Sequence, residues 1–98
     1  MRLDIDFTFE VGTEERHMVT FHWGQMLGRI RITVDGDEVV AKNRAIPLGR
    51  TRTRTFELSV GHLEVHDVVI EKVAKRLLSG ARRQKCRAFV DGELIGEY

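Results

Sequence analysis

The chain has 98 residues, a formal net charge of +1, 42% hydrophobic residues and 32% charged residues. This length suits one domain with a single modest core, and the composition excludes a disordered chain. No apolar run approaches the ~20 residues that span a bilayer, and the N-terminus lacks the continuous apolar region of a secretory signal. We therefore expect no membrane association. The single cysteine, Cys86, cannot form an internal disulfide, which favours a reducing cytoplasm.

The first third of the chain alternates apolar and polar residues, a pattern that predicts half-buried β-strands. Residues 5–11 read IDFTFEV, residues 17–23 read HMVTFHW, and residues 30–34 read IRITV. The sequence GTEE at residues 12–15 is typical of a turn, and the two glycines of WGQMLGR predict a loop between the next two strands. Three consecutive strands are therefore expected here.

A ten-residue pattern occurs twice, as RITVDGDEVV at residues 31–40 and as RAFVDGELIG at residues 87–96. Asp-Gly between two alternating runs predicts a β-hairpin with a type I′ turn, because that turn needs positive φ at both central residues. Glycine reaches this region freely, and aspartate tolerates it better than most residues. We therefore predict tight turns with positive φ at Gly36 and Gly92.

The middle of the chain contains the only proline, Pro47, which cannot donate to a sheet and so predicts an edge strand or a loop. The sequence TRTRTFELSVG follows at residues 51–61. Its arginines have the same parity as Phe56 and Leu58, so a regular strand would change from basic to apolar along one face. We expect a bulge or a loop near Thr55 to remove this conflict.

Residues 68–79 fit two structures. Their apolar residues match the i, i+3, i+4 stripe of an amphipathic helix, with Asp67 as the N-cap and Gly80 as the C-terminal stop. As a strand, the same segment would pair through a turn at residues 79–82 with residues 84–92. The helix would make the fold α+β, whereas the strand would make it all-β.

The alternating apolar positions also predict a core. Ten side chains are expected to be mostly buried: Phe7, Phe9, Phe21, Trp23, Ile32, Val34, Phe56, Leu58, Phe89 and Val90. Cys86 alternates with Ala88 and Val90, which favours an inward structural thiol. The alternative is a nucleophilic thiolate, because the charges of Lys85 and Arg87 would lower its pKa.

Four pieces of the chain, in this order and spacing, resemble the Fas apoptotic inhibitory molecule family. They are FHWGQMLGRIRITVDGDEVV (21–40), AIPLG (45–49), FELSVG (56–61) and AFVDGELI (88–95). Members of that family carry two consecutive β-sandwich domains of mainly antiparallel strands. The resemblance implies that residues 1–98 form one such domain, an all-β antiparallel sandwich of seven or eight strands. It also favours a strand over the alternative helix at residues 68–79.

The resemblance implies a role as well as a fold. The family is not known for catalysis, so the chain is expected to be a non-catalytic protein-interaction or regulatory module. Such a module acts through a protein partner and needs no cofactor. No catalytic residue follows from the resemblance.

A metal-dependent activity is one alternative to that role. His62, Glu64 and His66 occur at i, i+2 and i+4, so on a strand they share a face and offer two imidazoles and a carboxylate to zinc or iron. The other interpretation is a solvated strand face opposite Leu63 and Val65. The H-x-E-x-H pattern has little specificity and no fourth ligand is identified, so we expect no metal here.

Polyanion or nucleic-acid binding by the basic half of the chain is the second alternative. Residues 1–41 hold four Lys/Arg against eight Asp/Glu, whereas residues 42–98 hold twelve against seven. Arg50, Arg52 and Arg54 form the candidate binding surface, because three like charges on one strand face cannot pack against a core without partners. The aromatic residues lie with the apolar positions, which disfavours base stacking. We expect these arginines to be solvated or paired with acids of the first half.

Overall fold

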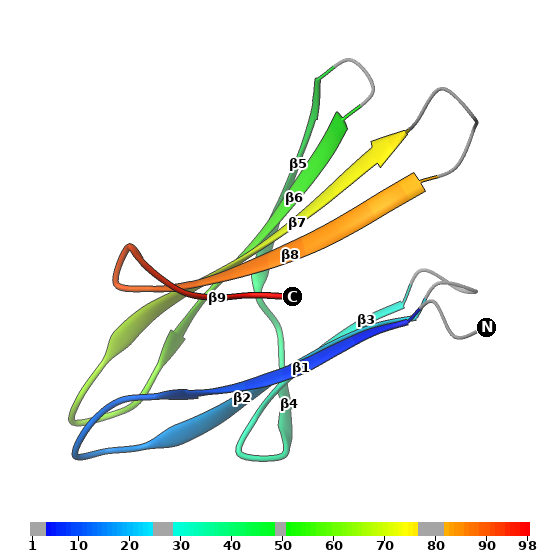
Figure 1. The fold of residues 1–98 in the computed structure, drawn as a ribbon. Coiled ribbons are helices and arrows are strands. Elements are labelled where there is room, and N and C mark those ends of the chain that lie inside the picture. The colour runs from blue at the N-terminus through cyan, green and yellow to red at the C-terminus, as the bar shows by residue number, and fades with distance from the viewer. Residues whose placement is uncertain (1–3, 25–28, 49–50, 77–81) are drawn as a thin grey trace. The chain divides into compact units, whose positions relative to one another are not determined.

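The computed structural model describes residues 4–24, 29–48, 51–76 and 82–98, and these residues form nine strands in two antiparallel sheets (Figure 1). The strands are β1 (Ile5–Val11), β2 (His17–Gly24), β3 (Arg29–Val34), β4 (Asp37–Val39), β5 (Lys42–Leu48), β6 (Thr51–Val60), β7 (His66–Arg76), β8 (Arg82–Val90) and β9 (Glu93–Glu97). The all-β class with antiparallel pairing is therefore confirmed, with nine strands where seven or eight were expected. No helix long and apolar enough to cross a membrane is found in the described parts of the chain.

The first sheet has the order β1-β2-β3-β4, and each strand pairs with the next one along the chain. Alternate residues of β1 and β2 are buried on one face of this sheet, as the sequence pattern predicts. Phe7 lies opposite Phe21, which in turn lies opposite Ile32. The rings of Phe7 and Phe21 stack with their centroids 5.1 Å apart. Cross-strand pairs of this kind stabilise the sheet in addition to the area that they bury.

The second sheet has the order β5-β6-β7-β8-β9. Residues 66–76 form β7, so the strand interpretation is confirmed over the helix for these residues, while residues 77–79 lie outside the described part. Alternate residues Val68 and Ile70 are buried and pair with Val90 and Ala88 of β8. Tertiary pairing therefore overrides the local helical stripe.

Both Val-Asp-Gly turns have the backbone that their sequence predicts. φ is 53° at Asp35 and 87° at Gly36, and it is 51° at Asp91 and 83° at Gly92. Positive φ at both central residues is the condition for a type I′ turn. The two hairpins β3–β4 and β8–β9 are therefore confirmed.

The strand β6 is regular where a bulge was expected. Its pairing with β5 runs without a shift from Lys42 opposite Glu57 to Leu48 opposite Thr51, so the expected bulge near Thr55 is wrong. The basic part of one strand face passes directly into the apolar part of the same face. A register shift occurs instead between β8 and β9, at Ala88 and Phe89.

The predicted core is confirmed in its larger side chains and incomplete elsewhere. The buried apolar residues are Phe7, Phe9, Val11, Val19, Phe21, Trp23, Ile32, Phe56, Val60, Val68, Ile70, Cys86 and Ala88. Val34, Leu58, Phe89 and Val90 are only half-buried. Val34 and Val90 directly precede a hairpin turn, and Phe89 lies on the strand face opposite that of Ala88. Alternation identifies a strand face, but it does not show how far along that face the core extends.

The chain divides into two compact units whose boundaries differ from the halves of the sequence. One unit comprises Met1–Ala41 together with Ser59–His66, and the other comprises Lys42–Leu58 together with Asp67–Tyr98. The end of β6 and the turn that follows it therefore belong with the N-terminal strands. The candidate site described below lies within this first unit.

Candidate functional site

Two turns of the first unit, residues 12–15 between β1 and β2 and residues 61–64 between β6 and β7, share one backbone design. Each begins with a glycine of positive φ, 101° at Gly12 and 109° at Gly61. A Cβ atom at Gly12 would lie 2.0 Å from the carbonyl oxygen of Glu15, and one at Gly61 would lie 1.9 Å from that of Glu64. Both sites therefore require glycine, for conformation and for space.

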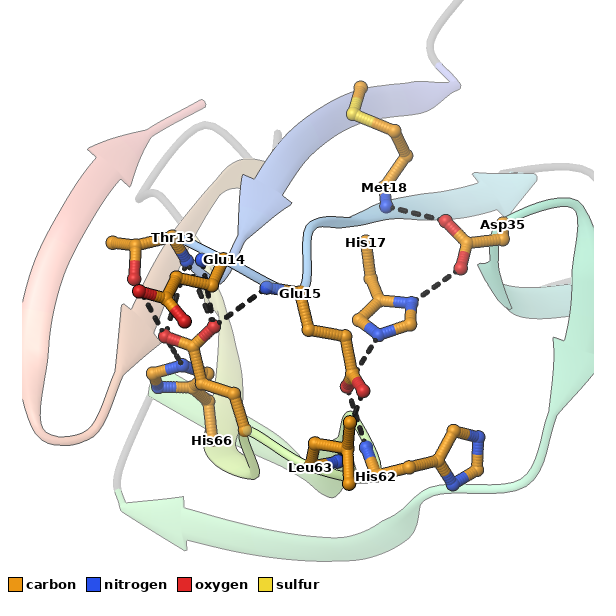
Figure 2. Close-up of polar contacts among 10 residues, drawn as sticks. Thr13, Glu14, Glu15, His17, Met18, Asp35, His62, Leu63 and His66 are labelled. Carbon is orange, nitrogen blue, oxygen red and sulfur yellow. Dashed lines mark hydrogen bonds and ion pairs between the residues drawn. The ribbon is translucent and has the colours of Figure 1, made fainter.

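The two turns cap each other through their glutamates (Figure 2). The Glu64 carboxylate accepts hydrogen bonds from the backbone N–H groups of Thr13 (3.1 Å), Glu14 (3.1 Å) and Glu15 (3.0 Å), and from the Thr13 hydroxyl (2.8 Å). In return, the Glu15 carboxylate accepts from the backbone N–H groups of His62 (2.6 Å) and Leu63 (3.0 Å). Neither turn is complete without the other.

These hydrogen bonds determine the charge of both carboxyl groups. Bonds from the backbone of Leu63, from His17 and from the backbone of His62 lower the pKa of Glu15 from 4.5 to about 2. Bonds from the backbone of Glu15 and the Thr13 hydroxyl, with a contribution from His66, lower the pKa of Glu64 to about 2. Donors that favour the charged form act in this direction. Both groups are thus ionised at neutral pH with their acceptors occupied, which makes them poor general acids or bases.

A histidine extends this network to a third turn. His17 Nε2 lies 2.9 Å from Glu15 Oε2, and His17 Nδ1 lies 2.5 Å from Asp35 Oδ2, in the first Val-Asp-Gly turn. Ionised carboxylates only accept hydrogen bonds, so both ring nitrogens must donate and the ring is an imidazolium cation. The bonds to Asp35 and then to Glu15 raise the pKa of His17. Asp35 also accepts from the Met18 backbone N–H at 2.8 Å.

The second half of the chain repeats parts of this arrangement. His66 Nε2 lies 3.1 Å from Glu64 Oε1, as His17 contacts Glu15. The Asp91 carboxylate accepts from the Asp67 backbone N–H at 2.9 Å, as Asp35 accepts from Met18. The signal is a repeated Val-Gly-x-x-Glu-x-His at residues 11–17 and 60–66, each followed by Val-Asp-Gly. The sequence-based prediction identified the Val-Asp-Gly segments but not the repeated Val-Gly-x-x-Glu-x-His, and it therefore missed Glu15 and His17.

The structure does not bring together all three residues of the alternative metal site. Residues 62–64 lie in a turn rather than on a strand, and the ring of His62 points away from His66 (Figure 2). The described residues contain no group of three or more His, Cys, Asp or Glu side chains that could hold a metal ion. The other interpretation, a solvated strand face opposite Leu63 and Val65, is not observed either, because these two side chains are themselves 97% and 58% exposed.

The cysteine is buried as expected. The Cys86 side chain is fully shielded from solvent, and this burial raises its pKa to about 11. At neutral pH the group is therefore a thiol and not the reactive thiolate. Its burial on the same strand face as the buried Ala88 makes it a small apolar core residue.

The three candidate arginines differ in what the structure says about them. Arg50 lies outside the described residues, Arg52 is exposed, and Arg54 is half-buried with its guanidinium 5.7 Å from the centroid of the Phe56 ring. The acids of residues 1–41 belong to the other compact unit. The expected solvation of these arginines, or their pairing with those acids, therefore stays a prediction.

Comparison with protein-family models, with curated proteins and with solved structures finds no match for this chain. The protein is therefore described by its own structural features. These are an all-β fold of two antiparallel sheets and a set of turns held by ionised, fully engaged carboxylates. The function must be argued from what this arrangement presents to solvent.

Proposed function

We propose that this protein is a non-catalytic module that binds a protein partner, the role implied by its resemblance to the Fas apoptotic inhibitory molecule family. The observation that carries the proposal is the β6–β7 turn, where Leu63 is 97% exposed and Val65 is 58% exposed. Exposed apolar side chains that lie together in one turn are candidates for a binding surface.

The backbone beneath these side chains is held before any partner arrives. The N–H of Leu63 is bonded to Glu15, and the following residue, Glu64, is bonded to the opposite turn. Binding through a rigid turn costs less conformational entropy than binding through a mobile loop. An apolar anchor on such a support has the properties of an interface hot spot.

The charges around the turn indicate what kind of pocket it fits. Glu14 and Asp67 are exposed beside it, and residues 1–41 have twice as many acids as bases. A partner with an apolar pocket for Leu63 and a rim of Lys or Arg would be complementary to this surface. The engaged carboxylates of Glu15 and Glu64 support a structural role rather than a catalytic one.

The test compares two exposed apolar residues, one inside the hydrogen-bonded β6–β7 turn and one outside it. A photo-crosslinking amino acid at position 63 identifies the partner in cells, and its affinity for the purified protein is then measured. Leu63→Ser should weaken binding at least about tenfold. Val40→Ser is the matched control, because Val40 is 98% exposed but lies outside the turn. Equal affinity in both variants, or no specific adduct at position 63, would overturn the proposal.

A further inference from the structure

The second sheet ends in β9, a strand with one open edge. The strand order is β5-β6-β7-β8-β9, so among the described residues only β8 pairs with β9 (Figure 1). All five residues of β9 are exposed or half-buried, and they include Leu94 at 47% and Ile95 at 42% exposure. An edge strand with exposed apolar side chains can pair with a strand of another chain.

The other three edge strands of the described sheets are protected in ways that β9 is not. The strand β4 has only three residues, and β5 contains Pro47, which has no backbone N–H to donate. In β1 the apolar residues alternate with exposed polar ones, among them Asp6 and Glu10. Short strands, prolines and outward charges all discourage the addition of a further strand. Among the four edges, β9 is therefore the best suited to receive a partner.

The backbone pairing shows which groups of β9 face the open edge. The Tyr98 N–H donates to the Cys86 carbonyl at 2.8 Å, and the Tyr98 carbonyl accepts from the Cys86 N–H at 3.0 Å. In an antiparallel pair, residues that exchange both bonds with the neighbouring strand alternate with residues that do not. The N–H and C=O of Glu97 therefore point away from β8, where an added strand would bond to them.

One row of side chains alternates in charge across the sheet up to this edge. Glu71 of β7 pairs with Arg87 of β8, which pairs with Glu97 of β9. The Arg87 guanidinium lies 3.9 Å from the Glu71 carboxylate and 3.3 Å from that of Glu97, whose side chain remains 44% exposed. Opposite charges in opposed positions stabilise a sheet, and like charges destabilise it. The next position in this row therefore favours Lys or Arg.

The neighbouring row on the same sheet face is apolar. Val69 pairs with Phe89, and Phe89 pairs with Leu94. Val69 and Phe89 are half-buried, so the row becomes more exposed towards the edge. Ile95 has no partner in the register, and this bulge places Leu94 and Glu97 on one face although they are three residues apart. The next position in this row favours an apolar residue.

We propose that β9 binds an extended segment of a partner protein as an additional antiparallel strand, and that this segment carries Lys or Arg two positions before an apolar residue. The basic residue lies opposite Glu97 and the apolar residue opposite Leu94, in the order that antiparallel addition requires. Main-chain hydrogen bonds give such a complex its affinity, and alternate side chains give it specificity. A second copy of β9 does not fit, because ELIGE contains no basic residue. The proposal goes beyond the proposed function, because it uses no residue of the β6–β7 turn.

The experiment measures the affinity of the purified protein for two end-capped, fluorescein-labelled peptides by fluorescence anisotropy. The peptides TTRTVTT and TTETVTT differ only in the residue that would lie opposite Glu97. The wild type should bind the arginine peptide about tenfold more tightly than the glutamate peptide. Amide hydrogen exchange gives a second measurement, because the Glu97 N–H should exchange more slowly when the arginine peptide is bound. Equal affinities, no binding of the arginine peptide at millimolar concentration, or unchanged exchange would overturn the proposal.

Two variants test the side chains of β9. Glu97→Lys should reverse the preference in favour of TTETVTT, and Leu94→Ser, which leaves the ion pairs intact, should weaken binding of TTRTVTT. The matched control is Glu10→Lys, because Glu10 is also an ion-paired acid on an edge strand, 3.3 Å from Arg16 and 49% exposed. This control should keep the wild-type preference. An equal change in both charge variants would show attraction to net charge and overturn the proposal. Leu63→Ser should not affect peptide binding, so this proposal and the proposed function fail separately.

Discussion

Single glycines with positive φ determine where the two Val-Asp-Gly hairpins turn. A Cβ at Gly36 or at Gly92 would have no heavy atom within 4 Å, so a substitution there is opposed by the backbone conformation alone. Gly36→Val and Gly92→Val should each lower the free energy of unfolding by roughly 1–2 kcal/mol. Urea denaturation measures the effect. Gly36→Asn is the control and should retain most of the stability, because asparagine tolerates this region. Unchanged stability of both valine variants would contradict the turn assignment.

The core depends on a second residue-scale feature, the ring of Phe21. This side chain has no exposed surface and stacks on Phe7. Phe21→Ala should cost on the order of 3–5 kcal/mol, because it removes buried area and leaves a cavity. Met18→Ala, at a neighbouring exposed position of β2, should cost much less. A near-zero cost for Phe21→Ala in chemical denaturation would show that the ring is not in the core.

At the scale of elements, the reciprocal glutamate caps join the β1–β2 and β6–β7 turns. The folded pKa of Glu64 is depressed from 4.5 to about 2. Its stabilisation is therefore complete above pH 4.5 and is lost as the pH falls towards 2. Glu64→Gln should lower the melting temperature at pH 7 and flatten its acid dependence. Glu14→Gln is the control, because it is the same isosteric change at a neighbouring position of the β1–β2 turn. Equal melting curves for the two variants would contradict the capping role.

The His17 contacts predict the opposite pH dependence at the same turns. The folded pKa of His17 is raised above 6.5 by Asp35 and Glu15. Its stabilisation is therefore complete below pH 6.5 and is lost as the pH rises through the folded pKa. The free energy of unfolding should therefore decline as the pH rises above 6.5 and through the raised pKa of His17. His17→Gln should abolish this decline, whereas His62→Gln, whose ring points away from the network, should retain it (Figure 2). A decline that persists in His17→Gln would assign it to another group.

At the scale of the whole molecule, the structural units and the sequence halves do not coincide. The first unit includes Ser59–His66, which contributes buried Val60 and the Glu64 cap. A fragment of residues 1–41 should therefore show no cooperative thermal transition by circular dichroism. The same fragment joined through a short Gly/Ser linker to residues 59–66 should regain one. Cooperative melting of residues 1–41 alone would show that the first unit does not need this segment.

The sequence by itself determined the strands of the first sheet, the two Val-Asp-Gly turns and the inward Cys86. These are local properties, because alternation and positive φ depend on residues adjacent in the chain. Tertiary structure decided that residues 66–76 form a strand, because pairing with β6 and β8 outweighs their helical stripe. It also decided the site. Glu64 and the N–H groups that it caps are about fifty residues apart, so neither end of these hydrogen bonds shows locally what it will bind.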